Sequence, residues 1–248
     1  MTTSPSQGRG RRVGLSRPVL VAGATELADA EGLDAVTIRR LAQRHGVSPM
    51  AIYAHFSDKE ALFDALGDAV LAQTGALEGL GGGGHEDGSP GERRAGLGGG
   101  SLGAGERGLE DLLTGFVTVL RAHPVLAPLA ARRILDCDAG RDVVESVLTR
   151  LGEEGHTPRE AAAASQFLLN ALVALVTGEP GRTAGADDEQ AHAQAVRERR
   201  ARLLALDPAR HPLVIAAADV FADCADPETY YADGIRRLVA GVRVKLAR

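Results

Sequence analysis

The chain has 248 residues, 44% of them hydrophobic, and a formal net charge of −5, which fits one large or two small globular domains. This acidic balance excludes a protein that coats nucleic acid through its overall charge. The N-terminus lacks the apolar core of a signal peptide, and no apolar run approaches a membrane span, so we expect a cytoplasmic protein without a membrane partner.

The first fifteen residues are polar and glycine-bearing, with three arginines close together. This composition predicts a disordered basic tail over 1–15. A helix is predicted to begin after Ser16, because Pro18 falls in its first turn and apolar residues then recur at helical spacing. Gly32 stands where a glycine commonly ends such a helix.

Two short helical patterns follow, joined at a glycine. Thr37 is the candidate N-cap of the first helix, and Gly46 comes two turns later, where a left-handed residue closes a helix. Ser48 and Pro49 are the predicted cap and first residue of the second helix, which runs to His55. This second helix is short and exposes small or polar side chains.

The tetrapeptide from Ser57 to Glu60 has the pattern of a capping box and predicts the start of a longer third helix. Residues 79–106 are then dominated by glycine and predict a flexible linker. They lack the Gly-Lys-Ser/Thr ending of a phosphate-binding loop. The linker separates one predicted domain over 16–78 from another over 107–248.

The second predicted domain has helical periodicity throughout, and no segment reads as a strand. The predicted fold class is therefore all-α, with an N-terminal helix-turn-helix domain of three helices followed by a helical bundle. The helices expected in the bundle cover about 109–123, 125–136, 143–151, 157–178, 189–205, 213–222 and 227–246.

A helix-turn-helix places its second helix in the major groove of DNA. In this chain the exposed cations gather at the motif, on Arg39, Arg40, Arg44 and Lys59, although the whole protein is acidic. From periodicity alone, two interpretations stay equally open. The unit binds DNA, or it is a solvated three-helix module with scattered arginines.

The same stretch resembles the DNA-binding domain of the TetR family of bacterial repressors, and its tetracycline-repressor-like branch in particular. The resemblance implies that Arg39 reaches a base edge or a nearby phosphate. It also implies that Ser48, Pro49 and Met50 face bases, and that Thr37, Tyr53, His55 and Lys59 hold phosphates. The matching residues are Thr37, Arg39, Leu41, Ala42, Gly46, Val47, Tyr53, His55, Lys59, Leu62 and Leu66.

The resemblance further implies that the second domain forms a homodimer and holds a small-molecule pocket. A magnesium–tetracycline effector is not expected, because Ala130 and Gly75 stand where that repressor has histidines. No metal or other cofactor is therefore predicted. The pocket candidates are Phe116, Gln166, Phe167, Asn170 and Thr177, together with His123, Arg132 and Arg133.

No catalytic residue is predicted, because the chain lacks the nucleophile-elbow and zinc-protease motifs and has no cysteine–histidine cluster. The predicted function is a ligand-responsive transcriptional regulator, a repressor that a small-molecule effector releases from a palindromic double-stranded DNA operator. The alternative is a helical adaptor that binds a partner protein without binding DNA.

Overall fold

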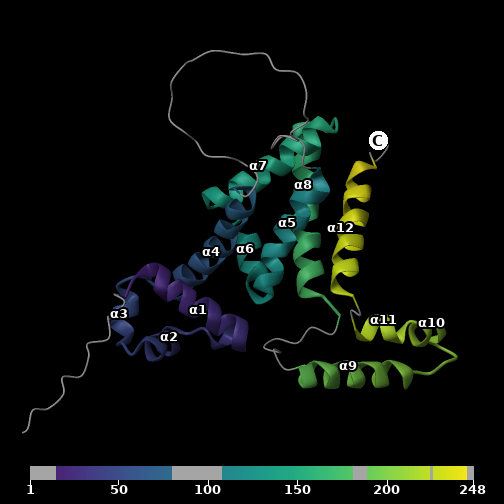
Figure 1. Cartoon of the computed structure of the whole chain (residues 1–248), viewed down its shortest axis with the longest axis horizontal. Helices are drawn as coiled ribbons and strands as arrows, with labels where there is room; N and C mark the ends of the chain where they lie inside the picture. Colours follow the sequence, from purple (N-terminus) through teal and green to yellow (C-terminus); the bar gives the residue numbers. More distant parts are fainter. Residues whose placement is uncertain (1–14, 80–107, 181–188, 224–225, 245–248) are drawn as a thin grey trace, which may run out of the picture.

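A computed structural model describes residues 15–79, 108–180, 189–223 and 226–244 (Figure 1). Every secondary-structure element in these ranges is helical, which confirms the all-α prediction. The predicted N-terminal tail and the predicted glycine-rich linker lie outside the described residues, apart from one residue of each.

The N-terminal helices pack around a small apolar core that includes Leu20, Leu41 and Ile52, all fully buried. Gly32 ends the first helix with a φ of 85°, a left-handed value that favours glycine. The structure therefore confirms both predicted ends of this helix, at Ser16 and Gly32. The elements are α1 (Arg17–Glu31), η1 (Leu33–Ala35), α2 (Ile38–His45), α3 (Pro49–Tyr53) and α4 (Lys59–Gly79).

The start of α4 differs from the predicted capping box by one residue. Asp58, not Ser57, accepts the hydrogen bond of the Ala61 N–H, at 2.7 Å, and it also accepts the Ser57 hydroxyl at 3.1 Å. These bonds, chiefly that from Ala61, hold the pKa of Asp58 below its ordinary value. The prediction of a capping box at Ser57 was wrong, because a carboxylate is a stronger acceptor than a hydroxyl for the unpaired N–H groups at a helix start.

The C-terminal bundle follows the predicted order with two corrections. The predicted helix over 213–222 is two short helices that break at Ala217. The last helix ends at Arg243, because Val244 is already extended. The elements are α5 (Leu109–Ala122), η2 (Pro124–Leu126), α6 (Ala127–Arg133), α7 (Asp138–Glu153), α8 (Pro158–Thr177), α9 (Glu189–Leu204), α10 (Pro212–Ala216), α11 (Ala218–Ala222) and α12 (Pro227–Arg243).

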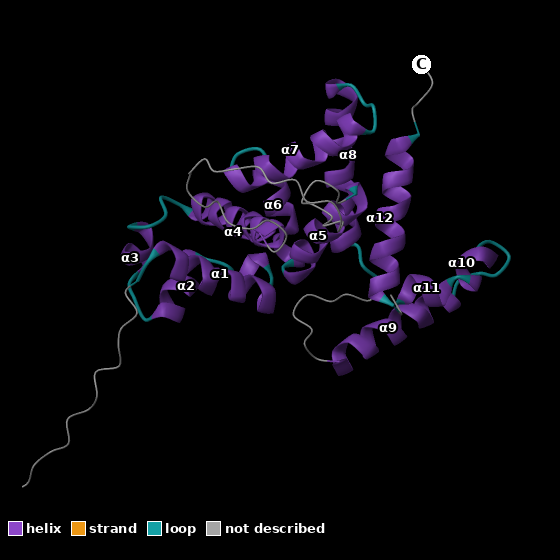
Figure 2. Ribbon diagram, turned by 45° about the horizontal axis from the view of Figure 1, so that its top comes forward, coloured by secondary structure: helices purple, strands orange, loops and turns teal. Residues whose placement is uncertain are grey.

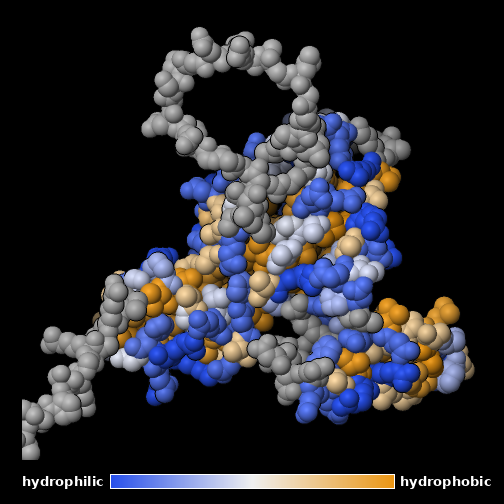
Figure 3. Space-filling model, in the orientation of Figure 1, coloured by the Kyte–Doolittle hydropathy of each residue, from blue (hydrophilic) through white to orange (hydrophobic). Residues whose placement is uncertain are grey.

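Most of these helices share one hydrophobic core. The buried apolar residues of α1 to α8 and of α12 form a single cluster, so the N-terminal helices and the bundle are packed together (Figures 1 and 2). The segment from α9 to α11 packs mainly on itself. It leaves Leu213, Val220 and Phe221 exposed, and Figure 3 shows this apolar surface beside α10 and α11.

Helix α4 is the main connection between the N-terminal helices and the bundle, and its closest partner is α6. Gly67 makes this approach possible. A Cβ atom added at Gly67 would lie 2.7 Å from the backbone oxygen of Leu129 and 2.9 Å from Cγ of Arg133. Only glycine lets the two helix backbones come this close without displacing α6.

We predict that Gly67→Ala destabilises the fold, because its methyl group meets a backbone atom that cannot rotate away. The expected loss is about 1–3 kcal/mol, as for other overpacked sites. Gly75→Ala on the same helix is the matched control, because Gly75 is exposed and an added Cβ meets nothing within 4 Å. It should gain about 0.5–1 kcal/mol of helix propensity. Urea unfolding of both variants checks this, and equal responses would contradict it.

Candidate functional site

The turn between α2 and α3 has the geometry that the sequence predicts. The Thr37 hydroxyl accepts the backbone N–H of Arg40 at 3.1 Å, so Thr37 caps α2. Gly46 has a φ of 65°, and the next residue, Val47, donates its N–H to the oxygen of Ala42 at 3.0 Å. This left-handed closure sets the direction in which α3 leaves α2.

Helix α3 has one buried side and one exposed side. Ile52 and the following Phe56 are 0% and 1% exposed, which confirms that both face the core. Met50 is 74% exposed and Tyr53 is 47% exposed. The core contacts therefore hold a five-residue helix rigidly while its outer side chains stay free to bind a partner.

Two details of α3 differ from the prediction. The helix ends at Tyr53, and His55 follows in a turn with its N–H donated to the oxygen of Ile52 at 2.9 Å. Ser48 occupies the N-cap position, but its side chain makes no capping hydrogen bond. Ser48 and the adjacent Pro49 are exposed, so the hydroxyl is available to a partner.

The remaining predicted contact residues lie beside this surface. Arg39 is exposed on α2, and Lys59 is exposed in the first turn of α4. The ammonium of Lys59 lies 4.8 Å from the ring centroid of Phe63, which favours an ordered position for the cation. His55 is half-buried beside α3.

The two other arginines of α2 are not free cations. Arg40 forms an ion pair with Glu31, and Arg44 forms one with Glu26. Both carboxylates belong to α1, so these pairs brace α2 against α1 and reduce the positive charge of the surface. Arg39 makes no ion pair within the described part of the chain. Its positive charge is therefore not balanced by a neighbouring carboxylate, as the sequence predicts.

Arg17 is a member of this surface that the sequence analysis missed. Its guanidinium lies 4.9 Å from the ring centroid of Phe56, so the start of α1 is held against the segment that follows α3. The pair joins residues far apart in the chain, and no local pattern signals it. An exposed arginine beside α3 adds a cation at the edge of the candidate interface.

A row of ion pairs joins the N-terminal unit to the bundle. Arg132 binds Glu60 and also Asp64, the latter at 2.8 Å. Arg133 binds Asp68 at 2.9 Å and lies 3.7 Å from Asp64. The hydrogen bond that Arg133 donates to Asp68 raises the pKa of Arg133 above its ordinary value, so this cation stays charged. The three acids are spaced four residues apart and share one face of α4.

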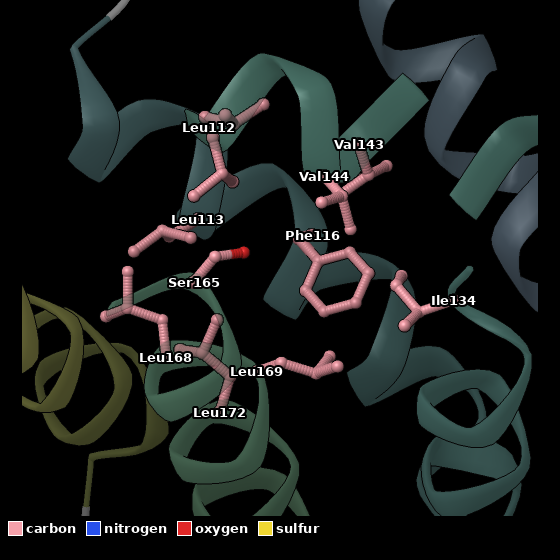
Figure 4. A pocket seen from close by; sticks show the side chains of 11 residues that line it. Leu112, Leu113, Phe116, Ile134, Val143, Val144, Ser165, Leu168, Leu169 and Leu172 are labelled. Atoms are coloured by element: carbon pink, nitrogen blue, oxygen red, sulfur yellow. The ribbon is translucent and has the colours of Figure 1, made fainter. Parts of the chain in front are cut away.

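An apolar cavity lies between α5, α7 and α8 and the end of α6 (Figure 4). Phe116 lines it, as the sequence predicts, and Ser165 is the one hydroxyl-bearing residue among the described residues of its lining. None of the lining residues carries a charge. They are Leu112, Leu113, Phe116, Ile134, Val143, Val144, Val147, Ser165, Leu168, Leu169 and Leu172.

The other pocket candidates do not line this cavity. Gln166, Phe167, Asn170 and Thr177 are all exposed on the outer side of α8, so they are not polar or aromatic groups embedded in the bundle. The sequence argument failed here because the outer face of α8 carries no charge, so its few polar side chains resemble groups embedded in an apolar helix. Thr177 donates its hydroxyl to the oxygen of Val173 at 2.9 Å.

The charged candidates have structural partners instead. Arg132 and Arg133 belong to the α4–α6 ion pairs described above. His123 lies 2.7 Å, Nδ1 to Oδ2, from Asp29 at the end of α1. This contact is a second link between the N-terminal unit and the bundle. His123 is therefore not a residue of the apolar cavity.

Helix α8 carries an uncharged outer face. By length and composition α8 could cross a membrane, which corrects the expectation that no apolar run approaches a span. Its inner side chains, including Leu168 and Leu172, belong to the core of the bundle. The exposed side chains of α8 that make up the outer face are Ala162, Ala163, Gln166, Phe167, Asn170, Ala174 and Thr177.

Comparison with known proteins identifies both parts of the chain. Residues 20–66 match the family described as "Bacterial regulatory proteins, tetR family". Residues 106–246 match the family described as "Tetracyclin repressor-like, C-terminal domain". The two matches together include α2, α3, the start of α4, all of α6 and the residues that line the apolar cavity.

Individual relatives agree with these matches. The chain is 46% identical over 57 residues to the tetracycline repressor protein class C of Escherichia coli, which is 23% of this chain and 26% of that protein. It thus spans about a quarter of the length of the class C and class A repressors. It is 25% identical over 260 residues to the HTH-type transcriptional repressor DrrR1 of Streptomyces coeruleorubidus, with 99% and 84% of the two chains covered.

The fold has solved counterparts. The TetR family protein ActR of Streptomyces coelicolor, crystallised in complex with (S)-DNPA, gives a TM-score of 0.58 at 21% identity. The alignment covers 92% of this chain and 96% of that one. At this identity the likeness concerns the fold alone.

We predict that the hydroxyls of Thr37 and Ser48 contribute differently to stability. Thr37→Ala removes the capping bond of α2 and should cost about 1 kcal/mol. Ser48→Ala removes no capping bond, so its effect on the free energy of unfolding should stay within about 0.5 kcal/mol. Denaturant titration of the two variants checks this. A larger loss for Ser48→Ala would mean that the hydroxyl supports α3 after all.

Proposed function

Because the chain belongs to the TetR family of bacterial regulatory proteins, we propose that it is a cytoplasmic repressor released from a palindromic operator by a small-molecule effector. The observation that carries this proposal is the surface of α3. Ser48, Pro49 and Met50 are consecutive and exposed, on a helix held by the buried Ile52 and Phe56. A rigid helix with unpaired outer side chains suits the major groove.

The contacts divide into two classes. Arg39, Ser48, Pro49 and Met50 supply base contacts, because they lie on the outer sides of α2 and α3. Phosphate contacts fix the register of a protein on DNA and carry no direct sequence information. We assign these to Thr37 at the start of α2, Tyr53 at the end of α3, His55 just after it and Lys59 at the start of α4.

We predict that Arg39→Ala and Lys59→Ala weaken DNA binding in different ways. Arg39→Ala should cost about 1–3 kcal/mol on the operator and relax preference at one base position. Lys59→Ala should weaken every sequence alike and lower the salt slope by about one. Fluorescence anisotropy with an operator selected from a randomised library, and with random DNA, measures both at several salt concentrations.

Arg44→Ala is the control, because the Arg44 side chain is paired with Glu26. It should change operator affinity less than Arg39→Ala does. An equal loss on operator and random DNA would remove Arg39 from base recognition. If no palindromic DNA is selected and binding shows no salt dependence, the chain is a helical adaptor, the alternative function.

The repressor acts as a homodimer in this proposal, since one five-residue helix is too short to specify an operator alone. The outer face of α8 supports this step, because it combines small side chains with the exposed ring of Phe167 and carries no charge. Helix α12 lies beside α8, and the same two helices of a second subunit would complete a four-helix interface (Figure 1). The two copies of α3 would then reach half-sites about 34–36 Å apart or a multiple of this distance.

We predict that Phe167→Asp converts the dimer to a monomer, because the carboxylate would lose its hydration inside the interface. Leu135→Asp is the matched control, because Leu135 is 61% exposed and follows α6, outside α8 and α12. Sedimentation velocity at micromolar concentration measures both. A parent chain that is monomeric there and still binds its operator tightly would contradict the dimer.

The release step runs through α4 in this proposal. Gly67 packs against Leu129, and Arg132 and Arg133 bind the acidic face of α4, so a shift of α6 is transmitted to α4. Helix α4 also contacts α1, so its tilt would move the unit that carries α3. The effector must bind the DNA-free arrangement more tightly, and a coupling of about 1–3 kcal/mol would give roughly 5–150-fold release.

A further inference from the structure

The apolar cavity between α5, α7 and α8 has a composition that selects its ligand. We infer that it takes a neutral, mainly apolar molecule with one hydrogen-bonding group, which pairs with the hydroxyl of Ser165. This inference names the ligand class of the effector site and rests on the proposed ligand-responsive function.

The lining excludes charged ligands and metal chelates. Ten of the eleven lining residues are apolar, and the eleventh is Ser165. Among the described residues, no arginine, lysine, histidine or carboxylate lines the cavity to balance a charge or hold a metal. Transfer of an ionised group into such surroundings is strongly unfavourable, whereas aliphatic and aromatic groups gain free energy there.

Ser165 is the polar group that remains for recognition. Figure 4 shows its hydroxyl directed into the cavity, toward Phe116. It has no hydrogen-bond partner among the described residues. Other hydroxyls on the bundle helices behave differently, since Thr114, Ser146 and Thr177 each donate to the carbonyl four residues earlier. The Ser165 hydroxyl therefore keeps one donor and its acceptor lone pairs for a ligand.

The cavity is narrow in this structure, with a volume of about 30 Å³, which is room for a few atoms only. A larger ligand must push its walls apart. One wall is Ile134, which follows Arg133 directly in the chain, and Gly140 packs against the Ile134 backbone. Displacement of Ile134 therefore pulls on the Arg133–Asp68 ion pair. Occupancy of the cavity is in this way connected to α4.

Three probes with the same ring system test the ligand class: 2-naphthol, naphthalene and 2-naphthoate. They carry a neutral hydroxyl, no polar group and a negative charge, respectively. The chain has no tryptophan, so naphthyl fluorescence can be followed without that background. With the full chain and no DNA, 2-naphthol should bind most tightly, and 2-naphthoate at least about tenfold more weakly.

Variants locate the binding to the cavity. Ser165→Ala should weaken 2-naphthol by about threefold to tenfold, the worth of one hydrogen bond, and leave naphthalene within about twofold. Ser165→Leu should abolish binding of all three probes by filling the cavity. Thr114→Ala is the matched control, because this exposed hydroxyl lies on the outer side of α5. It should bind all probes as the parent does.

Three results would overturn the inference: 2-naphthoate binding as tightly as 2-naphthol, Ser165→Ala weakening naphthalene as much as 2-naphthol, or 2-naphthol binding surviving Ser165→Leu. A parallel operator titration with saturating 2-naphthol separates the regulatory proposal from the ligand class. If 2-naphthol binds as expected and operator affinity stays unchanged, the ligand class is supported and release through this cavity fails. If Ser165→Leu still binds 2-naphthol and 2-naphthol still releases this variant from the operator, the ligand binds outside the cavity. The inference on the ligand class then fails.

Discussion

The close packing of α4 against α6 is the contact on which the arrangement of this protein depends. Gly67 lets the two backbones approach, since an added Cβ would lie 2.7 Å from a backbone oxygen of α6. Arg132 and Arg133 then bind the acids that line α4. Close packing and partly exposed ion pairs act together here, so the N-terminal unit cannot rotate freely on the bundle.

The contact between α4 and α6 also determines the orientation of the short helix α3. Helix α3 is only five residues long and depends on Ile52 and Phe56 for its position. Those residues join the same core as α4, so the orientation of α3 follows the orientation of α4. At the other end, the apolar cavity reaches Ile134, next to Arg133 in the chain. The candidate interface and the cavity are thus connected through packed helices of the described chain.

The sequence predicted best where the signal is local. Thr37 caps α2, Gly46 adopts a left-handed conformation, and Ile52 and Phe56 are buried, as expected. Caps, glycine turns and apolar stripes depend on neighbouring residues, which share one helix or one turn. The prediction failed at Ser57 because Asp58 beside it is a stronger acceptor, and competition between adjacent caps is not visible in a pattern.

The sequence by itself determined the all-helical class, the helix-turn-helix and the residues on its outer side. Only the tertiary structure decided which side of α8 is inward, and it placed Gln166, Phe167 and Asn170 outside and Ser165 at the cavity. The outer face of α8 carries no charged residue, so charge does not mark it as the side that faces outward. The pairing of Arg133 with Asp68 was likewise hidden, because it joins residues 65 positions apart that meet only when α4 packs on α6.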